Sequence, residues 1–287
     1  MLGPSYISDF SSRGPTLDGR TKPEIIAPGQ WISSAGAKPD QVGECDPSDG
    51  QNPGPNEKKD GLVSFQGTSM ATPILAGTAA LIRQYLSEGF YPTGERNETH
   101  SYPNPSSALI KAILLNGAQY MKGVDNNHGK ITDVDPYDNT QNFGRVSLID
   151  SIFLKDKTNI KLKIWDREII VDGQDHKYEI TIDMAGGCTN PTFTATLVWT
   201  DAPALSGCAD CLINDIDLFV IKNNDESITY YPNGLSTKDY KNNAERVRID
   251  DVKDNDTFTI YVKGDNILSD VQQYALVATG KLKKALL

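Results

Sequence analysis

The sequence predicts a chain of two parts, a helix-containing region followed by an all-β antiparallel region, and two observations carry this prediction. Up to about residue 150, two apolar segments with helical spacing are separated by loops rich in Gly, Pro and Asn. Beyond that point, short alternating or β-branched runs are separated by Asn, Asp and Gly. We place the boundary near residues 150–158, which divides the chain into domains 1–153 and 154–287.

Length and charge limit the classes of function. A chain of 287 residues can hold two domains, and its 28 basic and 38 acidic residues give a formal net charge of −10. Such a chain lacks the diffuse attraction of a basic protein for phosphate, so we expect no nucleic-acid partner. Its apolar stretches are shorter than the roughly 20 residues that cross a bilayer, and no leader-like segment follows Met1. We therefore expect no membrane span in this chain.

The first region is predicted to contain two helices. Residues 1–36 are expected to form loops, and residues 38–60 an exposed polar insertion. A helix should begin near Ser69 and run through MATPILAGTAALIRQYL, with Pro73 in its first turn. A polar loop over residues 88–104 precedes the second helix, in PSSALIKAILLNGA, which has a Ser cap and ends at Gly117.

The second region is predicted to consist of strands. Seven or eight short strands over about 130 residues are typical of an antiparallel β-sandwich or jelly roll. The runs that carry this prediction are KLKIW, KYEITID, FTATLVWT, DLFVIK, ERVRI, TFTIYV and YALVATG.

The segment SFQGTSMATPILAG permits two interpretations of Ser69. Serine is a common helix cap, and spacing alone favours that role. A serine in the first turn can also point its hydroxyl outward beside unpaired backbone N–H groups, which can hold a developing oxyanion.

Four ordered motifs resemble the subtilisin-like serine peptidases, the subtilase family. GTSMATPILAG is similar to the nucleophile signature of the family, and FSSRGPTLDGRTKPEIIAPG to the block that precedes it. Downstream, PSSALIKAILLNGA and NFGRVSL resemble the following helix and the closing element of the catalytic domain. The resemblance implies that the first domain is the C-terminal portion of an α/β subtilisin-like domain. It also implies that Ser69 is the nucleophile of an endopeptidase acting on polypeptides, and that Gly67 and Thr68 contact substrate.

The second region resembles the β-barrel appended to the bacterial alkaline subtilases, and in kind the P domain of the proprotein convertases. ATLVWTDAPA, LINDIDLFV, YKNNAERVRI and YALVATG follow in the order of that barrel, except that a cysteine-bearing loop is inserted between Pro203 and Leu212. This resemblance implies the jelly-roll fold for residues 154–287.

In the family the catalytic Asp and His precede the serine, but the histidines here are His100, His128 and His176. All three follow Ser69, and we interpret them as solvated loop residues. We therefore expect this chain alone to be inactive and to depend on an upstream catalytic segment or a propeptide. The alternative is a non-catalytic pseudo-peptidase whose β region is a binding or assembly module.

An acidic group predicts a structural calcium site. Asp215 and Asp217 lie two apart on an expected strand, hence on one face, with Asp201 and Asp210 nearby in sequence. Family barrels often bind calcium, and the alternative is a solvated acidic edge.

The cysteines and two sequons favour a secreted or luminal protein. We expect structural disulfides among Cys188, Cys208 and Cys211, with Cys45 free or paired outside the chain. Zinc or redox roles for the CxxC pair are the weaker alternatives. Asn97-Glu98-Thr99 and Asn255-Asp256-Thr257 are acceptor sequons for N-linked glycans.

Overall fold

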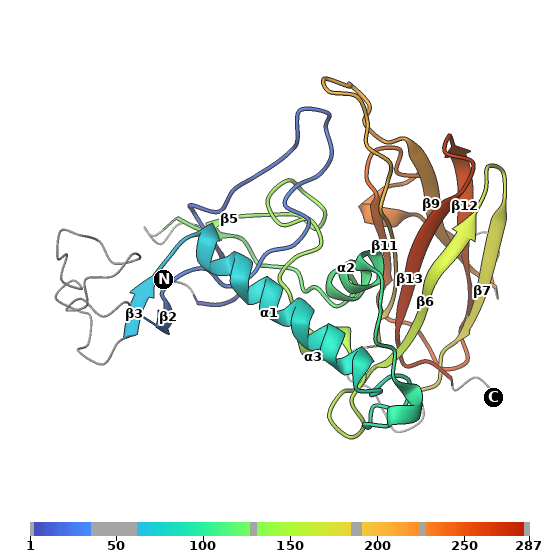
Figure 1. Cartoon of the computed structure of the whole chain (residues 1–287), viewed down its shortest axis with the longest axis horizontal. Coiled ribbons are helices and arrows are strands. Elements are labelled where there is room, and N and C mark those ends of the chain that lie inside the picture. The colour runs from blue at the N-terminus through green and yellow to red at the C-terminus, as the bar shows by residue number, and fades with distance from the viewer. Residues whose placement is uncertain are drawn as a thin grey trace.

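The computed structural model describes residues 3–35, 62–126, 131–184, 191–223, 225 and 228–283 (Figure 1). The described chain is mostly sheet with few helices, and its α-helices all lie before residue 152. The predicted insertion over residues 38–60 lies outside the described residues.

Helix α1 (Thr68–Ser87) is the long helix that crosses the centre of Figure 1. It begins after Gly67, which acts as the N-cap at φ 149°, a left-handed conformation that favours glycine. The helix is confirmed, but it begins one residue earlier than predicted. Pro73 consequently lies in the second turn and not in the first, so the Ser69 carbonyl cannot accept the usual hydrogen bond from residue 73.

Helix α2 (Ser107–Asn116) has the predicted local signals. The Ser106 hydroxyl accepts a hydrogen bond from Leu109 N at 2.9 Å, and the helix ends at Gly117. A Cβ at Gly117 would lie 2.2 Å from Ser151 Oγ, so only glycine fits against the short helix α3 (Leu148–Ser151). A 3-10 turn, η1 (Glu98–His100), interrupts the predicted loop between α1 and α2.

Short strands surround the start of α1. Strand β1 (Ile7–Ser8) pairs in parallel with β4 (Val124–Asp125), which pairs with β5 (Ile131–Thr132). A second pair consists of β2 (Ile32–Ala35) and β3 (Leu62–Phe65). The prediction that residues 1–36 are loops alone is therefore wrong, because β1 and β2 are too short to show a periodic pattern.

The second region forms two four-stranded antiparallel sheets, in the orders β11-β8-β13-β6 and β10-β9-β12-β7. Each of the seven predicted runs overlaps a strand, and the two-residue strand β10 was not predicted. A second 3-10 turn, η2 (Pro232–Gly234), follows β10. The strands are β6 (Lys161–Ile170), β7 (Asp175–Thr181), β8 (Phe193–Trp199), β9 (Asn214–Lys222), β10 (Thr229–Tyr230), β11 (Ala244–Ile249), β12 (Thr257–Ile267) and β13 (Gln272–Gly280).

One hydrophobic core lies between the two sheets. Alternate residues of the strands face inward, as the period of two requires. Leu197 and Leu276 come from one sheet, and Leu218 and Ile260 from the other; each is fully buried. The sheets therefore pack face to face, as the right side of Figure 1 shows.

Helix α2 covers the outer face of the β11-β8-β13-β6 sheet (Figure 1). Leu109 and Ile113 share a core with Val198 and Val277. The buried Asn116 side chain joins the helix to the sheet, because its amide donates to Thr279 Oγ1 at 2.6 Å and its carbonyl accepts from Thr196 Oγ1 at 2.9 Å.

Arg246 on β11 also links the sheet to the helical region. The residue is 1% exposed, and its guanidinium donates hydrogen bonds to the carbonyls of Leu115, Ala118 and Phe143. The rings of Tyr120 and Tyr137 lie 5.1 and 5.2 Å from the guanidinium carbon. The buried charge is therefore satisfied by several carbonyl dipoles and aromatic faces.

Candidate active site

Ser69 is the second residue of α1, and it is exposed. The N-cap is Gly67, and no side chain caps this helix end, so the interpretation of Ser69 as a cap is wrong. The N–H groups of Met70 and Ala71 both donate to Gly67 O, whereas those of Thr68 and Ser69 precede the first helical hydrogen bond. Among the residues that the structure describes, the Ser69 hydroxyl has no hydrogen-bond partner, and it lies beside the positive end of a 20-residue helix.

The turn Ala27-Pro28-Gly29 positions the start of α1. Gly67 N donates to Gly29 O at 2.8 Å, and a Cβ at Gly29 would lie 2.7 Å from Gly67 O. Two motifs that are nearly 40 residues apart therefore contact each other at the serine segment, and only glycine at position 29 permits this approach.

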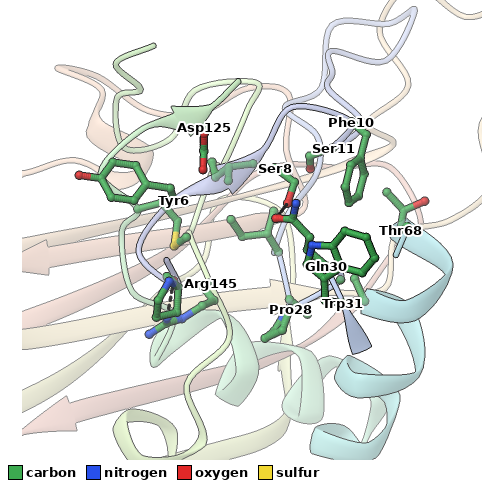
Figure 2. A pocket seen from close by; sticks show the side chains of 18 of the residues that line it. Tyr6, Ser8, Phe10, Ser11, Pro28, Gln30, Trp31, Thr68, Asp125 and Arg145 are labelled. Atoms are coloured by element: carbon green, nitrogen blue, oxygen red, sulfur yellow. Dashed lines mark hydrogen bonds between the residues drawn. The ribbon is translucent and has the colours of Figure 1, made fainter. Parts of the chain in front are cut away.

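A pocket of about 310 Å³ lies beside the first turn of α1 (Figure 2). Gly67 and Thr68, the predicted substrate-contact residues, line this pocket. Ser69 is not among the lining residues. Figure 2 shows Phe10, Trp31 and Thr68 around one side of the pocket.

Several lining residues were missed by the sequence analysis. Gln30 Oε1 accepts a hydrogen bond from Ser8 Oγ at 3.0 Å, and Arg145 donates to Pro4 O at 2.7 Å. Trp31 is 56% exposed and has a φ of 54°. The signal available in the sequence was an aromatic residue two positions after the glycine of the Ala27-Pro28-Gly29 turn.

The described histidines do not lie at Ser69. His100 ends η1, which follows the opposite end of α1, and His128 lies outside the described residues. The interpretation of His176 as a solvated loop residue is wrong. It lies on β7, and its Nδ1 is 2.6 Å from the hydroxyl of the buried Tyr274.

The predicted calcium ligands are not gathered around one point. Asp201 accepts backbone hydrogen bonds from Ala202, Ile213 and Asn214, which closes the base of its loop. Asp217 Oδ2 lies 2.6 Å from the Lys238 ammonium. Among the described residues, no group of three or more His, Cys, Asp or Glu side chains is arranged to hold a metal ion.

The carboxylates around Asp217 are neutralised by the Lys238 ammonium. Burial, followed by the neighbouring Asp217 carboxylate, raises the pKa of Asp215 to about 7. Lys238 also pairs with Asp265 at 2.6 Å, so one ammonium bridges two carboxylates. Because an ammonium already fills this position, these residues fit calcium poorly, and calcium binding stays a prediction.

Cys208 and Cys211 form a disulfide in the loop between β8 and β9. This pairing bears out a disulfide within the predicted set of cysteines. Cys45 and Cys188 lie outside the described residues.

Comparisons with known proteins find similarity to serine peptidases over the segment that contains Ser69. The profile of the subtilase family, Peptidase_S8, matches residues 3–140, which include Ser69 and every residue that lines the neighbouring pocket except Arg145. Slightly less than half of the chain is therefore similar to the subtilase family. The subtilase profile ends before β6, so it does not describe the two sheets.

Two relatives align with almost the entire chain. The serine protease/ABC transporter B family protein tagB of Dictyostelium discoideum is 30% identical over 316 residues, covering 96% of this chain and 16% of that protein. The serine protease/ABC transporter B family protein tagD of the same organism is 32% identical over 326 residues, covering 98% of this chain and 17% of that protein. This chain therefore spans about a sixth of the length of these relatives.

A bacterial relative aligns with less than half of the chain. The serine protease AprX of Bacillus subtilis is 33% identical over 121 residues, covering 42% of this chain and 22% of that protein. In the described part of the chain, no helix has the length and apolar character to span a membrane.

Proposed function

We propose that this chain is part of a serine endopeptidase that hydrolyses polypeptides through an acyl-enzyme at Ser69. The observation that carries the proposal is the exposed Ser69 hydroxyl at the start of α1, next to N–H groups that have no helical partner. The subtilase match to the same residues supports it.

In the proposed mechanism, a base takes the Ser69 proton and the oxygen attacks the scissile carbonyl. The Ser69 backbone N–H donates to the oxyanion that forms, and the dipole of α1 favours the negative charge there. The amine leaves with a proton, and water then releases the acyl group from Ser69. Gly67 and Thr68 border the adjoining pocket, where they can contact the substrate backbone.

We propose that the catalytic Asp and His come from a segment upstream of this chain. We also propose a propeptide as a further partner of this chain. A serine hydroxyl without a base is a poor nucleophile at neutral pH, so this chain alone would be inactive. The tagB and tagD proteins, which are much longer, support the existence of further segments in proteins of this type.

We propose domains of residues 1–153 and 154–287, a partial α/β subtilisin-like domain and a jelly roll. Each sheet alternates strands from the start and the end of the second region, β6-β13-β8-β11 and β7-β12-β9-β10. This strand order supports the jelly-roll assignment.

A secreted or luminal location and a structural calcium ion also remain our proposals. The location rests on the Cys208–Cys211 disulfide and on the sequons. Calcium can be tested by thermal unfolding in calcium or in a chelator, with Asp215→Asn as the matched variant. Equal melting temperatures in both conditions would remove the ion from the proposal.

The alternative function is a non-catalytic binding module built on the two sheets. The described residues place no histidine at Ser69, which is the observation that favours it. Labelling the full-length natural protein with a fluorophosphonate distinguishes the two, because this reagent reacts with activated serines.

We expect one adduct, on Ser69, which Ser69→Ala abolishes. Ser87→Ala, at the other end of α1, is the matched control and should leave the labelling unchanged. A folded natural protein without an adduct would favour the non-catalytic alternative.

A further inference from the structure

The loop between α1 and α2 presents one of the two sequons on a firmly held surface. Asn97 N donates to Gly89 O at 3.2 Å, and Ser101 Oγ donates to Ser87 O at 2.7 Å. A Cβ at Gly89 would lie 1.9 Å from Asn97 O, so the loop closes directly onto the end of α1. Asn97, Glu98 and Thr99 are nevertheless all exposed.

The side chains of this sequon have a specific arrangement. Asn97 Oδ1 accepts hydrogen bonds from both Thr99 N, at 3.0 Å, and Thr99 Oγ1, at 2.8 Å. These bonds use the carbonyl oxygen of the carboxamide and leave its Nδ2 without a partner among the described residues. The acceptor nitrogen is therefore exposed, and the threonine hydroxyl lies against the same carboxamide.

The second sequon differs in the partner of its acceptor nitrogen and in the burial of its middle residue. Asn255 Nδ2 donates to Asp254 Oδ2 at 2.9 Å, so its nitrogen is already engaged. Asp256 is 8% exposed and forms an ion pair with Lys222 at 2.8 Å. Thr257 begins β12 and pairs with Thr181 of β7. Asn255 itself is exposed, but its acceptor nitrogen is engaged and the two residues that follow it are held by an ion pair and by the sheet.

We propose that Asn97 is a site of N-linked glycosylation and that Asn255 is not. The donor is an oligosaccharide linked to a polyprenyl diphosphate. Asn97 Nδ2 attacks the first sugar carbon, an N–C bond forms, and the C–O bond to the diphosphate breaks. The lipid diphosphate leaves, and a base of the transferase takes the amide proton. The proposal requires the exported location proposed above and is independent of peptidase activity.

A glycan at Asn97 is compatible with an accessible Ser69. The two residues flank opposite ends of α1, and a 20-residue helix is about 30 Å long. The sugar would cover the surface of the loop over residues 88–104 and would leave the pocket at Gly67 and Thr68 open.

The test is peptide mapping of the full-length natural protein isolated from its own cells. Glycan release by a glycoamidase in heavy-oxygen water converts each modified Asn into a labelled Asp. We expect the label at Asn97 and an unmodified Asn255. An unmodified Asn97, or a label at Asn255 as complete as at Asn97, would overturn the proposal.

Three variants of the natural protein sharpen this result. Thr99→Ala should abolish the modification at Asn97, and Thr99→Ser, which keeps the hydroxyl, should preserve it. Asn255→Gln should not change the electrophoretic mobility before or after glycan release. Because Thr99 is exposed, its replacement should leave the protein folded. Persistence of the glycan in Thr99→Ala would contradict the assigned site.

Discussion

Helices α1 and α2 differ in how much of their apolar surface the chain covers. In α2, seven of ten residues are buried, between α1 and the β11-β8-β13-β6 sheet. In α1, three of twenty residues are buried, and these three, Ile82, Tyr85 and Leu86, all lie near its C-terminal end. Pro73, Ala76, Gly77 and Ala80 are exposed, and Leu81 is 51% exposed.

The difference shows that the described contacts bury the apolar surface of α2 and leave much of that of α1 exposed. A helix with apolar residues on several faces is normally buried. The small residues of α1 would allow another backbone to approach closely. The exposed half of α1 contains Ser69, so the proposed upstream segment would complete both the core and the active site.

The largest effect is expected at Arg246, which holds the C-terminal end of α2. Arg246→Met should destabilise the chain by about 3–5 kcal/mol, because three buried carbonyls lose a charged donor. Arg248→Met is the matched control. Its guanidinium pairs with the more exposed Asp250, so we expect about 1 kcal/mol or less. Urea unfolding measures both, and equal losses would show that burial of Arg246 is not decisive.

A second prediction compares the two helices directly. Ile113→Ala on α2 should cost about 2–5 kcal/mol, because Ile113 is fully buried. Leu81→Ala on α1 should cost about 0.5 kcal/mol or less in this chain.

In the full-length protein, the cost of Leu81→Ala should rise to about 2 kcal/mol or more if another segment buries that side chain. Thermal unfolding of both variants in both lengths of protein tests this. An unchanged small effect in the full-length protein would mean that Leu81 remains exposed there.

A smaller effect is expected at Glu24, which connects the turn before α1 to α2. Burial acts to raise the pKa of Glu24, but the ammonium groups of Lys111 and Lys22 outweigh it and lower the pKa below its ordinary value of 4.5. The ionised form is thus favoured in the native state. Its contribution is present above pH 4.5 and is lost as the pH falls through the lowered value.

Glu24→Gln should therefore cost about 0.5–1 kcal/mol near pH 7, because partial exposure screens these pairs. It should also make the acid loss of stability shallower. Urea unfolding from pH 7 to pH 3 measures both effects. Parallel pH profiles for the variant and the parent would contradict the assigned role of Glu24.

Several features of the fold were predictable because their causes are local. Ser106 and Gly117 bound α2 through contacts within a few residues, and the strand runs show a period of two. Short elements were missed because their causes are not local. Strand β10 has only two residues, and its existence depends on pairing with Val220 and Ile221 of β9.

The candidate site shows the same division. The motif around Ser69 was recognisable, but its pocket also requires Phe10, Gln30 and Trp31, which loop-like sequence did not single out. His176 was misinterpreted because the polar residues around it resemble a loop, whereas its contact with Tyr274 crosses 98 positions of sequence.

The sequence by itself determined the two helices, the seven main strands and the segment that bears Ser69, since caps, glycine turns and hydrophobic periodicity act over short distances. Only the tertiary structure decided the order of strands, the burial of Arg246 and the pairing of Lys238 with Asp217. Those features join groups far apart along the chain, and their energies depend on desolvation and geometry that exist only after the chain has packed.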